Sequence, residues 1–109
     1  ELNFLEILGK VLLPSIPEYA SNNMHMFYLI CNSRQERDGL IEYLLEKQIK
    51  AVFHYVPLHS STFFKPLYSG EELVNCNRFS DCLVRLPFFY ELTNEMQNRV
   101  IEEVKLYFY

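Results

Sequence analysis

Two histidines and a tyrosine lie close together in residues 53–61, FHYVPLHSS. The chain has only three histidines, so this segment holds most of its imidazole groups. Imidazole and phenol side chains both donate and accept hydrogen bonds, which suits them to a polyhydroxylated or phosphorylated ligand. We therefore expect His54, Tyr55 and His59 to contact a ligand. The alternative is a turn shaped by its proline, in which one histidine only ties the loop to backbone carbonyls.

Other familiar catalytic patterns are incomplete in this chain. Ser60 and Ser61 follow a histidine, but the G-x-S-x-G frame of a serine hydrolase does not surround them. The three glycines are scattered and form no phosphate-binding loop. We therefore expect a portion of an enzyme, or a binding module, rather than a self-contained catalytic domain.

The three cysteines, Cys31, Cys76 and Cys82, have no C-x-x-C spacing. We expect them to be partly buried thiols in a reducing compartment, and we expect no metal site. The alternative is a structural zinc site that uses His54, His59 and one cysteine.

Composition limits the class of protein. The chain has 109 residues, half of them apolar, which is enough for one small domain with a core. Its net charge is −4 and it has no basic stripe, so we do not expect it to bind nucleic acid. It has no run of about 18 uncharged apolar residues, so we expect no membrane span. Because it lacks an initiator methionine, we expect a piece of a longer protein.

Hydrophobic patterning predicts the elements that position these residues. Residues 24–31 are apolar in both alternating sets, which predicts a strand buried on both faces. Ser33 and Glu36 form a capping-box pattern at the start of a helix. In full, we expect a helix end or extended arm at 1–13, a strand at 24–31, a helix at 33–48, a strand at 49–56, a long loop, a helix at 72–84, an extended segment at 84–87 and a helix after Thr93. This order predicts a small α/β or α+β fold, a short sheet packed with helices.

Arg85, in the extended segment, is a further candidate for ligand binding. Its guanidinium group has the right geometry to pair with a carboxylate. The alternative is an ion pair with one of the many glutamates of the chain.

Several segments resemble one protein family. PSIPE, NNMHMFYLI, LIEYLLEKQIKAVFHYVPLHSS, RLPFFYELT and the closing VIEEVKLYFY are similar to the C-terminal part of the DegT/DnrJ/EryC1/StrS sugar aminotransferases. The resemblance covers residues 13–109. It implies that residues 1–109 are the small C-terminal domain of a fold-type I enzyme that depends on pyridoxal phosphate (PLP).

The resemblance also implies how the whole protein works. The large domain of the same chain would hold most of the PLP and carry the Schiff-base lysine, which no lysine of this sequence matches. The full-length enzyme would be a cytoplasmic homodimer that moves an amino group from glutamate to a dTDP-4-oxo-6-deoxy sugar for a bacterial surface polysaccharide. His54, Tyr55 and His59 would face the cleft that the sugar nucleotide enters. Alone, this domain would be inactive. A different sugar nucleotide, or a binding module without catalysis, remains an alternative.

Overall fold

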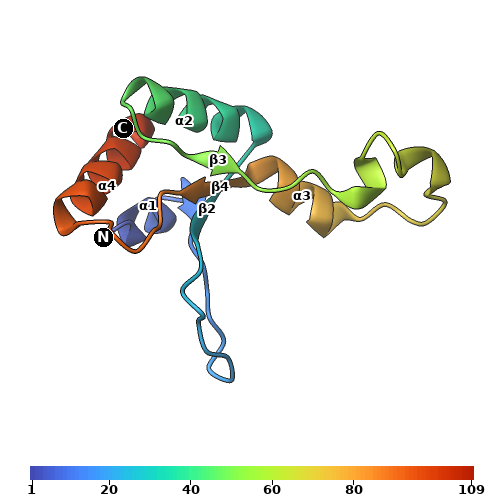
Figure 1. Cartoon of the computed structure of the whole chain (residues 1–109), viewed down its shortest axis with the longest axis horizontal. Helices are drawn as coiled ribbons and strands as arrows, with labels where there is room; N and C mark the ends of the chain where they lie inside the picture. The colour runs from blue at the N-terminus through green and yellow to red at the C-terminus, as the bar shows by residue number, and fades with distance from the viewer.

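Four short strands form one sheet in the computed structural model, which describes residues 1–109. The strands follow the spatial order β1-β2-β4-β3, and every neighbouring pair is antiparallel. In chain order the elements are α1 (Asn3–Ile7), β1 (Val11–Leu12), β2 (Phe27–Cys31), α2 (Arg34–Glu46), β3 (Val52–Phe53), α3 (Val74–Cys82), β4 (Leu83–Leu86) and α4 (Asn94–Phe108). The fold is therefore a small α+β domain, as the sequence predicts (Figure 1).

The sheet has two different faces, and its register assigns residues to each. Leu29 pairs with Val84, and Tyr28 pairs with Arg85. Directly paired residues project to the same face, and successive residues alternate between faces. The first face therefore carries Leu29 and Val84. The second face carries Tyr28, Arg85 and, through its pairing with Arg85, Val52.

The first face is the base of the main core. Helices α1, α2 and α4 cover it, as Figure 1 shows, and each contributes residues that are almost completely buried. The buried residues of this core are Leu2, Leu5, Val11, Leu29, Cys31, Leu40, Leu44, Ile49, Ala51, Val84, Leu86, Val100, Ile101 and Val104. A smaller cluster, Ile30, Cys82 and Leu83 with the partly buried Tyr28, occupies the second face. Strand β2 is thus buried on both faces over its last three residues, as its sequence predicts.

Both long helices begin at the predicted caps. The hydroxyl of Ser33 accepts a hydrogen bond from the backbone N–H of Glu36, and that of Thr93 accepts one from Met96. The Glu36 carboxylate, however, accepts from the N–H of Asn32 rather than from Ser33 itself. The capping box is therefore shifted by one residue at its carboxylate side, and it still satisfies two free N–H groups.

Arg37 corrects the sequence interpretation of α2. Charge alone predicts that it belongs to a solvated face, but only 5% of the residue is exposed. Its guanidinium carbon lies 5.3 Å from the centre of the Phe53 ring, and its Nε lies 2.6 Å from Asp38 Oδ1 without hydrogen-bond alignment. The apolar stem and the ring contact explain why an arginine is tolerated between α2 and β3.

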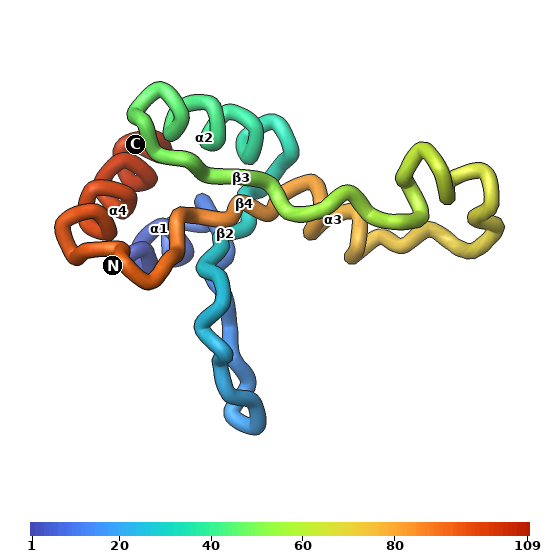
Figure 2. Tube along the Cα trace, in the orientation of Figure 1, coloured from blue at the N-terminus to red at the C-terminus, as the bar shows by residue number.

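Two long segments project from the body and are named here the first arm (residues 13–26) and the second arm (residues 54–73). Figure 2 shows the first arm as a narrow loop between β1 and β2, and the second as a longer excursion between β3 and α3. They give the chain a radius of gyration of 15.5 Å, compared with about 13 Å for a compact domain of this length. Two short 3₁₀ turns, Leu58–Ser60 and Lys65–Leu67, lie in the second arm.

Other sequence predictions were wrong in their bounds. The first predicted strand begins at Phe27 rather than at residue 24, and only Val52 and Phe53 of residues 49–56 pair with the sheet. The spacing of residues 72–84 predicts one apolar side made of Leu73, Cys76, Phe79 and Leu83. Only Leu83 is buried, as the first residue of β4, and the buried residue of α3 is Cys82. Residues 1–13 form both a short helix and a short strand. None of the helices is long and apolar enough to span a membrane.

Replacing Gly39 with alanine is expected to destabilise the chain, although alanine normally favours a helix by about 1 kcal/mol over glycine. A Cβ at position 39 would lie 2.5 Å from the Tyr107 hydroxyl, which donates a hydrogen bond to the Glu36 carbonyl. In a Tyr107→Phe background the nearest ring atom would be at 3.6 Å, an ordinary contact. There Gly39→Ala should instead stabilise by about 0.5–1 kcal/mol. Urea unfolding of the four variants tests this reversal, and the same sign in both backgrounds would contradict it.

Candidate functional site

His54 follows β3 at the base of the second arm. Its ring lies 4.7 Å from that of Tyr55, and its Nδ1 is buried without a hydrogen-bond partner. The Tyr55 carbonyl accepts a hydrogen bond from the Ser80 hydroxyl, which fixes this part of the arm against α3. Because Nδ1 is closed to solvent, a ligand would reach this imidazole through Nε2, which is neither buried nor hydrogen-bonded.

Arg85 lies near His54 on the second face of the sheet. It sits in β4 between Tyr28 and Val52, and its side chain is half-buried. Arg85 takes part in none of the ion pairs of the structure, although an ion pair with a glutamate was the alternative that its sequence allowed. Burial, the Arg85 guanidinium and the His25 imidazole together hold the pKa of His54 below its usual value. His54 therefore favours its neutral form.

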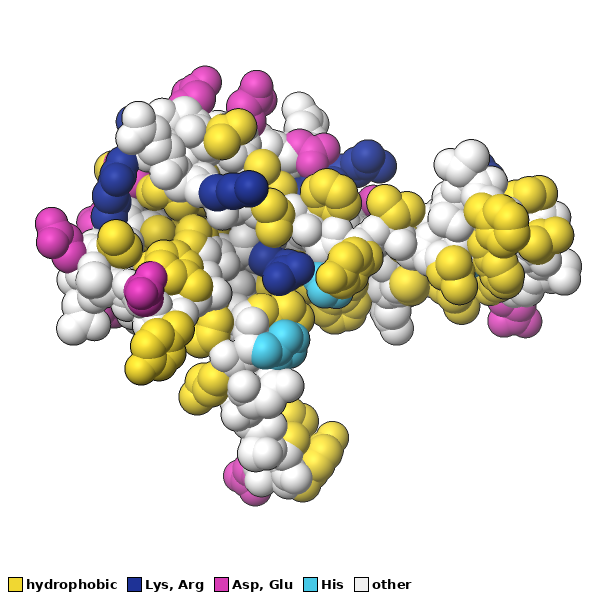
Figure 3. Space-filling view, viewed as in Figure 1, with side chains coloured by type: hydrophobic (Ala, Val, Ile, Leu, Met, Phe, Trp, Pro, Cys, Tyr) yellow, Lys and Arg dark blue, Asp and Glu magenta, His cyan; other side chains and the backbone are white.

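His25 is the residue of this neighbourhood that sequence reasoning missed. Its place at the start of a predicted strand indicates a hydrogen-bonded histidine at a strand end. Its Nδ1 does lie 2.6 Å from Asn23 Oδ1. It belongs to the first arm and affects His54 from there. The bases of the two arms come together only because β4 pairs with both β2 and β3, so no local sequence signal could have found it. Figure 3 shows imidazole (cyan) and basic (dark blue) side chains together where the arms meet the body.

His59 lies apart from this group, farther along the second arm. Its Nε2 lies 2.8 Å from Asn77 Oδ1 of α3, and its ring centre lies 5.4 Å from that of Tyr68. The structure thus brings His54, Tyr55 and Arg85 near one another and places His59 where it links the arm to α3.

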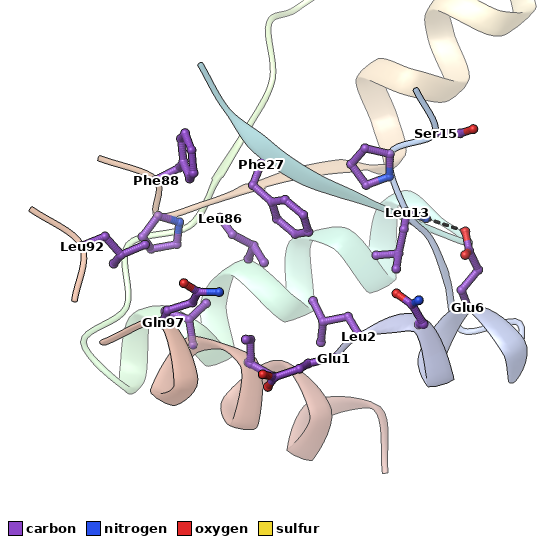
Figure 4. Close-up of a pocket in the computed structure, with 15 residues that line it drawn as sticks. Glu1, Leu2, Glu6, Leu13, Ser15, Phe27, Leu86, Phe88, Leu92 and Gln97 are labelled. Atoms are coloured by element: carbon purple, nitrogen blue, oxygen red, sulfur yellow. Dashed lines mark hydrogen bonds between the residues drawn. The ribbon is translucent and has the colours of Figure 1, made fainter. Parts of the chain in front are cut away.

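A pocket of about 560 Å³ lies on the other side of the domain, near α1 and α4 (Figure 4). Leu2, Leu13, Phe27 and Leu86 project into it, and the Glu6 carboxylate accepts a hydrogen bond from the backbone of residue 13 at its rim. None of its lining residues is a lysine, arginine or histidine. A phosphate group would therefore find no cationic partner there, and the pocket is a poor site for a sugar nucleotide.

The cysteines offer no metal site. Cys31 and Cys82 are buried and Cys76 is exposed, and none forms a disulfide. No group of three or more histidine, cysteine, aspartate or glutamate side chains lies close enough together to hold a metal ion. The zinc site considered from the sequence therefore gains no support from the geometry.

The lysines do not form a PLP site by themselves. A lysine that forms a Schiff base must lose its proton and lie in a protected cleft. Four of the five lysines are exposed, and the fifth, Lys105, donates a hydrogen bond to Glu102, which raises its pKa. The residues present therefore do not fit the covalent attachment of this cofactor within the chain.

The fold as a whole matches solved structures over almost its full length. DesV of S. venezuelae superposes with a TM-score of 0.86 over 98% of this chain and 29% of its own, with 26% identity. The aminotransferase TlmJ of Streptoalloteichus hindustanus gives 0.82 over 97% and 28%, with 19% identity. NtdA of Bacillus subtilis, solved with bound PMP, gives 0.82 over 98% and 25%, with 22% identity. The chain therefore has the fold of the C-terminal domain of fold-type I aminotransferases.

Sequence comparison agrees with this fold. The model of the DegT/DnrJ/EryC1/StrS aminotransferase family matches residues 3–105, and the chain belongs to this family. A pleiotropic regulatory protein of Geobacillus stearothermophilus is 29% identical over 90 residues, which are 81% of this chain and 24% of that protein. The chain thus spans about a quarter of the length of the relatives it matches.

Proposed function

We propose that residues 1–109 are the C-terminal small domain of a longer, cytoplasmic PLP-dependent aminotransferase. The whole enzyme transfers the amino group of glutamate to a dTDP-4-oxo-6-deoxy sugar, the activity of a dTDP-4-amino-4,6-dideoxygalactose transaminase. Its product enters a bacterial surface polysaccharide such as the enterobacterial common antigen or lipopolysaccharide. The observation that carries this proposal is the family match over residues 3–105, in a chain about a quarter as long as its relatives.

The large domain of the same protein holds most of the PLP in this proposal. That assignment agrees with the exposed lysines of this chain, which do not fit the cofactor. His54, Tyr55 and Arg85 contact the substrate, His59 shapes the cleft by linking the second arm to α3, and none of the four transfers protons. Their hydrogen-bonding groups suit the hydroxyl and phosphate groups of a sugar nucleotide.

The arms supply the surface for the large domain and for a second subunit. Large apolar side chains are exposed along both, among them Tyr19 at 92% and Phe63 at 81%. The space-filling view shows such side chains along each arm (Figure 3). Large apolar side chains that gather on an exposed surface in this way are typical of protein interfaces. We therefore propose that the arms pack against the large domain, and that the full-length enzyme is a homodimer.

The test is an assay of the longer protein, expressed with its upstream coding sequence. It should aminate dTDP-4-oxo-6-deoxyglucose with glutamate and PLP, and mass spectrometry should detect the 4-amino sugar nucleotide. The 109-residue chain should give no product. Activity only with a UDP- or GDP-linked oxo-sugar would support the alternative sugar nucleotide. Absence of turnover with each of these oxo-sugars, in a longer protein that folds, would favour a binding module without catalysis.

In the same protein, Tyr55→Phe is expected to lower kcat/KM by about tenfold. Loss of one hydrogen bond worth about 1.4 kcal/mol in the transition state gives this factor. The matched control is Tyr90→Phe, because Tyr90 is fully exposed and belongs to neither arm. An equal effect of the two changes on kcat/KM would contradict a role of Tyr55 in the cleft.

A further inference from the structure

We propose that Arg85, His54 and His25 together bind an oxyanion, either a carboxylate or a phosphate group, on the second face of the sheet. The three residues come from β4, the base of the second arm and the first arm. Residues far apart in the sequence therefore converge at one place. The existence of this site is independent of the proposed function, whereas its assignment to a substrate group rests on it.

Arg85 is a positive charge that the chain does not neutralise. The protein has a net charge of −4 and 14 acidic side chains, yet none of them lies within ion-pair distance of Arg85. By contrast, Arg34 lies within ion-pair distance of Asp38 and Asp81. A half-buried guanidinium without a carboxylate partner favours an anion from outside, which it can bind through two parallel hydrogen bonds.

The two histidines add hydrogen-bonding groups to the same place. Nδ1 of His54 is buried without a partner, whereas its Nε2 is neither buried nor hydrogen-bonded, so an oxygen of the anion would meet the ring at Nε2. The ring of His25 is held by its contact with Asn23 through Nδ1, which leaves Nε2 free. Tyr28 pairs with Arg85 across β2 and β4, so its side chain projects to the same face of the sheet.

The charges around His54 make anion binding measurable. The groups that face it are Arg85 from β4 and His25 from the first arm, with Tyr55 against its ring, and carboxylates are not among them. Its pKa is low because burial, Arg85 and His25 disfavour the imidazolium form. A bound anion would offset the positive charges, so the pKa of His54 should rise when the site is filled.

The experiment is a titration of the 109-residue chain with inorganic pyrophosphate and, separately, with glutarate at constant ionic strength. The C2–H signals of the three histidines are followed by NMR across pH. The signals of His54 and His25 should shift and saturate, and the pKa of His54 should rise. His59, which contacts Asn77 farther along the arm, should not respond and reports that the second arm stays folded.

Arg85→Gln should weaken binding at least tenfold, and Arg85→Lys should retain part of it. The control is Arg78→Gln, which removes the same charge from an exposed position on α3 that forms no ion pair and should leave binding unchanged. Tighter binding of pyrophosphate assigns the site to the diphosphate of the nucleotide, and tighter binding of glutarate assigns it to the amino donor. Equal loss in both glutamine variants, or shifts of all three histidines without saturation, would overturn the proposal. Saturable binding in a protein that lacks transaminase activity would leave the site standing and reject only the proposed function.

Discussion

Leu44→Ala is expected to destabilise the chain by about 2–5 kcal/mol, the range for a leucine removed from a packed core. Leu44 has no exposed surface and belongs to the main core between α2, α4 and the sheet. Small domains have total stabilities of only about 5–15 kcal/mol. The change should therefore shift urea unfolding strongly, and it could unfold much of the population at room temperature.

Leu45→Ala is the matched control, because Leu45 is the next residue on the same helix and is 64% exposed. Sequence periodicity assigns both leucines to the same buried stripe, so it predicts similar losses. The structure instead predicts a loss below about 0.5 kcal/mol at position 45. Similar losses at the two positions would show that the isolated chain packs α2 differently.

Raising the pH above 9 is expected to lower the free energy of unfolding, and Cys31 should be a main cause. Burial raises the pKa of its thiol from 9.0 to about 12. Above pH 9 the unfolded chain loses this proton while the folded chain keeps it. The unfolded state then binds fewer protons, so stability falls as pH rises, by up to about 1.4 kcal/mol per pH unit from this one group.

Urea unfolding of the wild type and Cys31→Ala, from pH 8 to 10.5 under reducing conditions, measures this slope. The variant should lose stability with pH less steeply, by about 1 kcal/mol per pH unit. Some slope should remain, because the pKa values of Cys82, Tyr43 and Tyr107 are also raised. Cys76→Ala is the control, since Cys76 is exposed. Identical slopes for the wild type and Cys31→Ala would contradict the burial of that thiol.

Local signals in the sequence were sufficient for the two long helices, α2 and α4. Ser33 and Thr93 have the side-chain oxygen that caps a helix, and the apolar spacing of 94–108 places Val100, Ile101 and Val104 in the core. The sheet was harder, because its two edge strands are only two residues long and carry almost no periodicity. Strand β4 was expected only as a brief extended segment, yet it lies at the centre of the sheet.

The candidate site shows the same division between local and distant information. His54 and Tyr55 were found from one segment of sequence and Arg85 from another, but no local pattern reported that Arg85 and His25 lie beside His54. The proximity of Arg85 depends on the pairing of Val52 with Arg85, and that of His25 on the first arm returning to β2. Arg37 was misjudged for a related reason, since its burial results from a contact with Phe53 that charge patterning does not report.

The position of β4 between β2 and β3 has a consequence for how the chain folds during synthesis. Strands β2 and β3 do not pair with each other, and the strand that joins them is made only after residues 54–82. Until then one edge of β2 is unpaired, and the apolar side of α2 lacks the β4 residues that cover it in the folded domain. Strands β1 and β2 can pair earlier, but the loop of residues 54–82 must close before β4 can pair with β3, and closing a long loop slows folding. We therefore expect this domain to fold late and in one step, once residues 83–108 have left the ribosome and α4 can complete the main core.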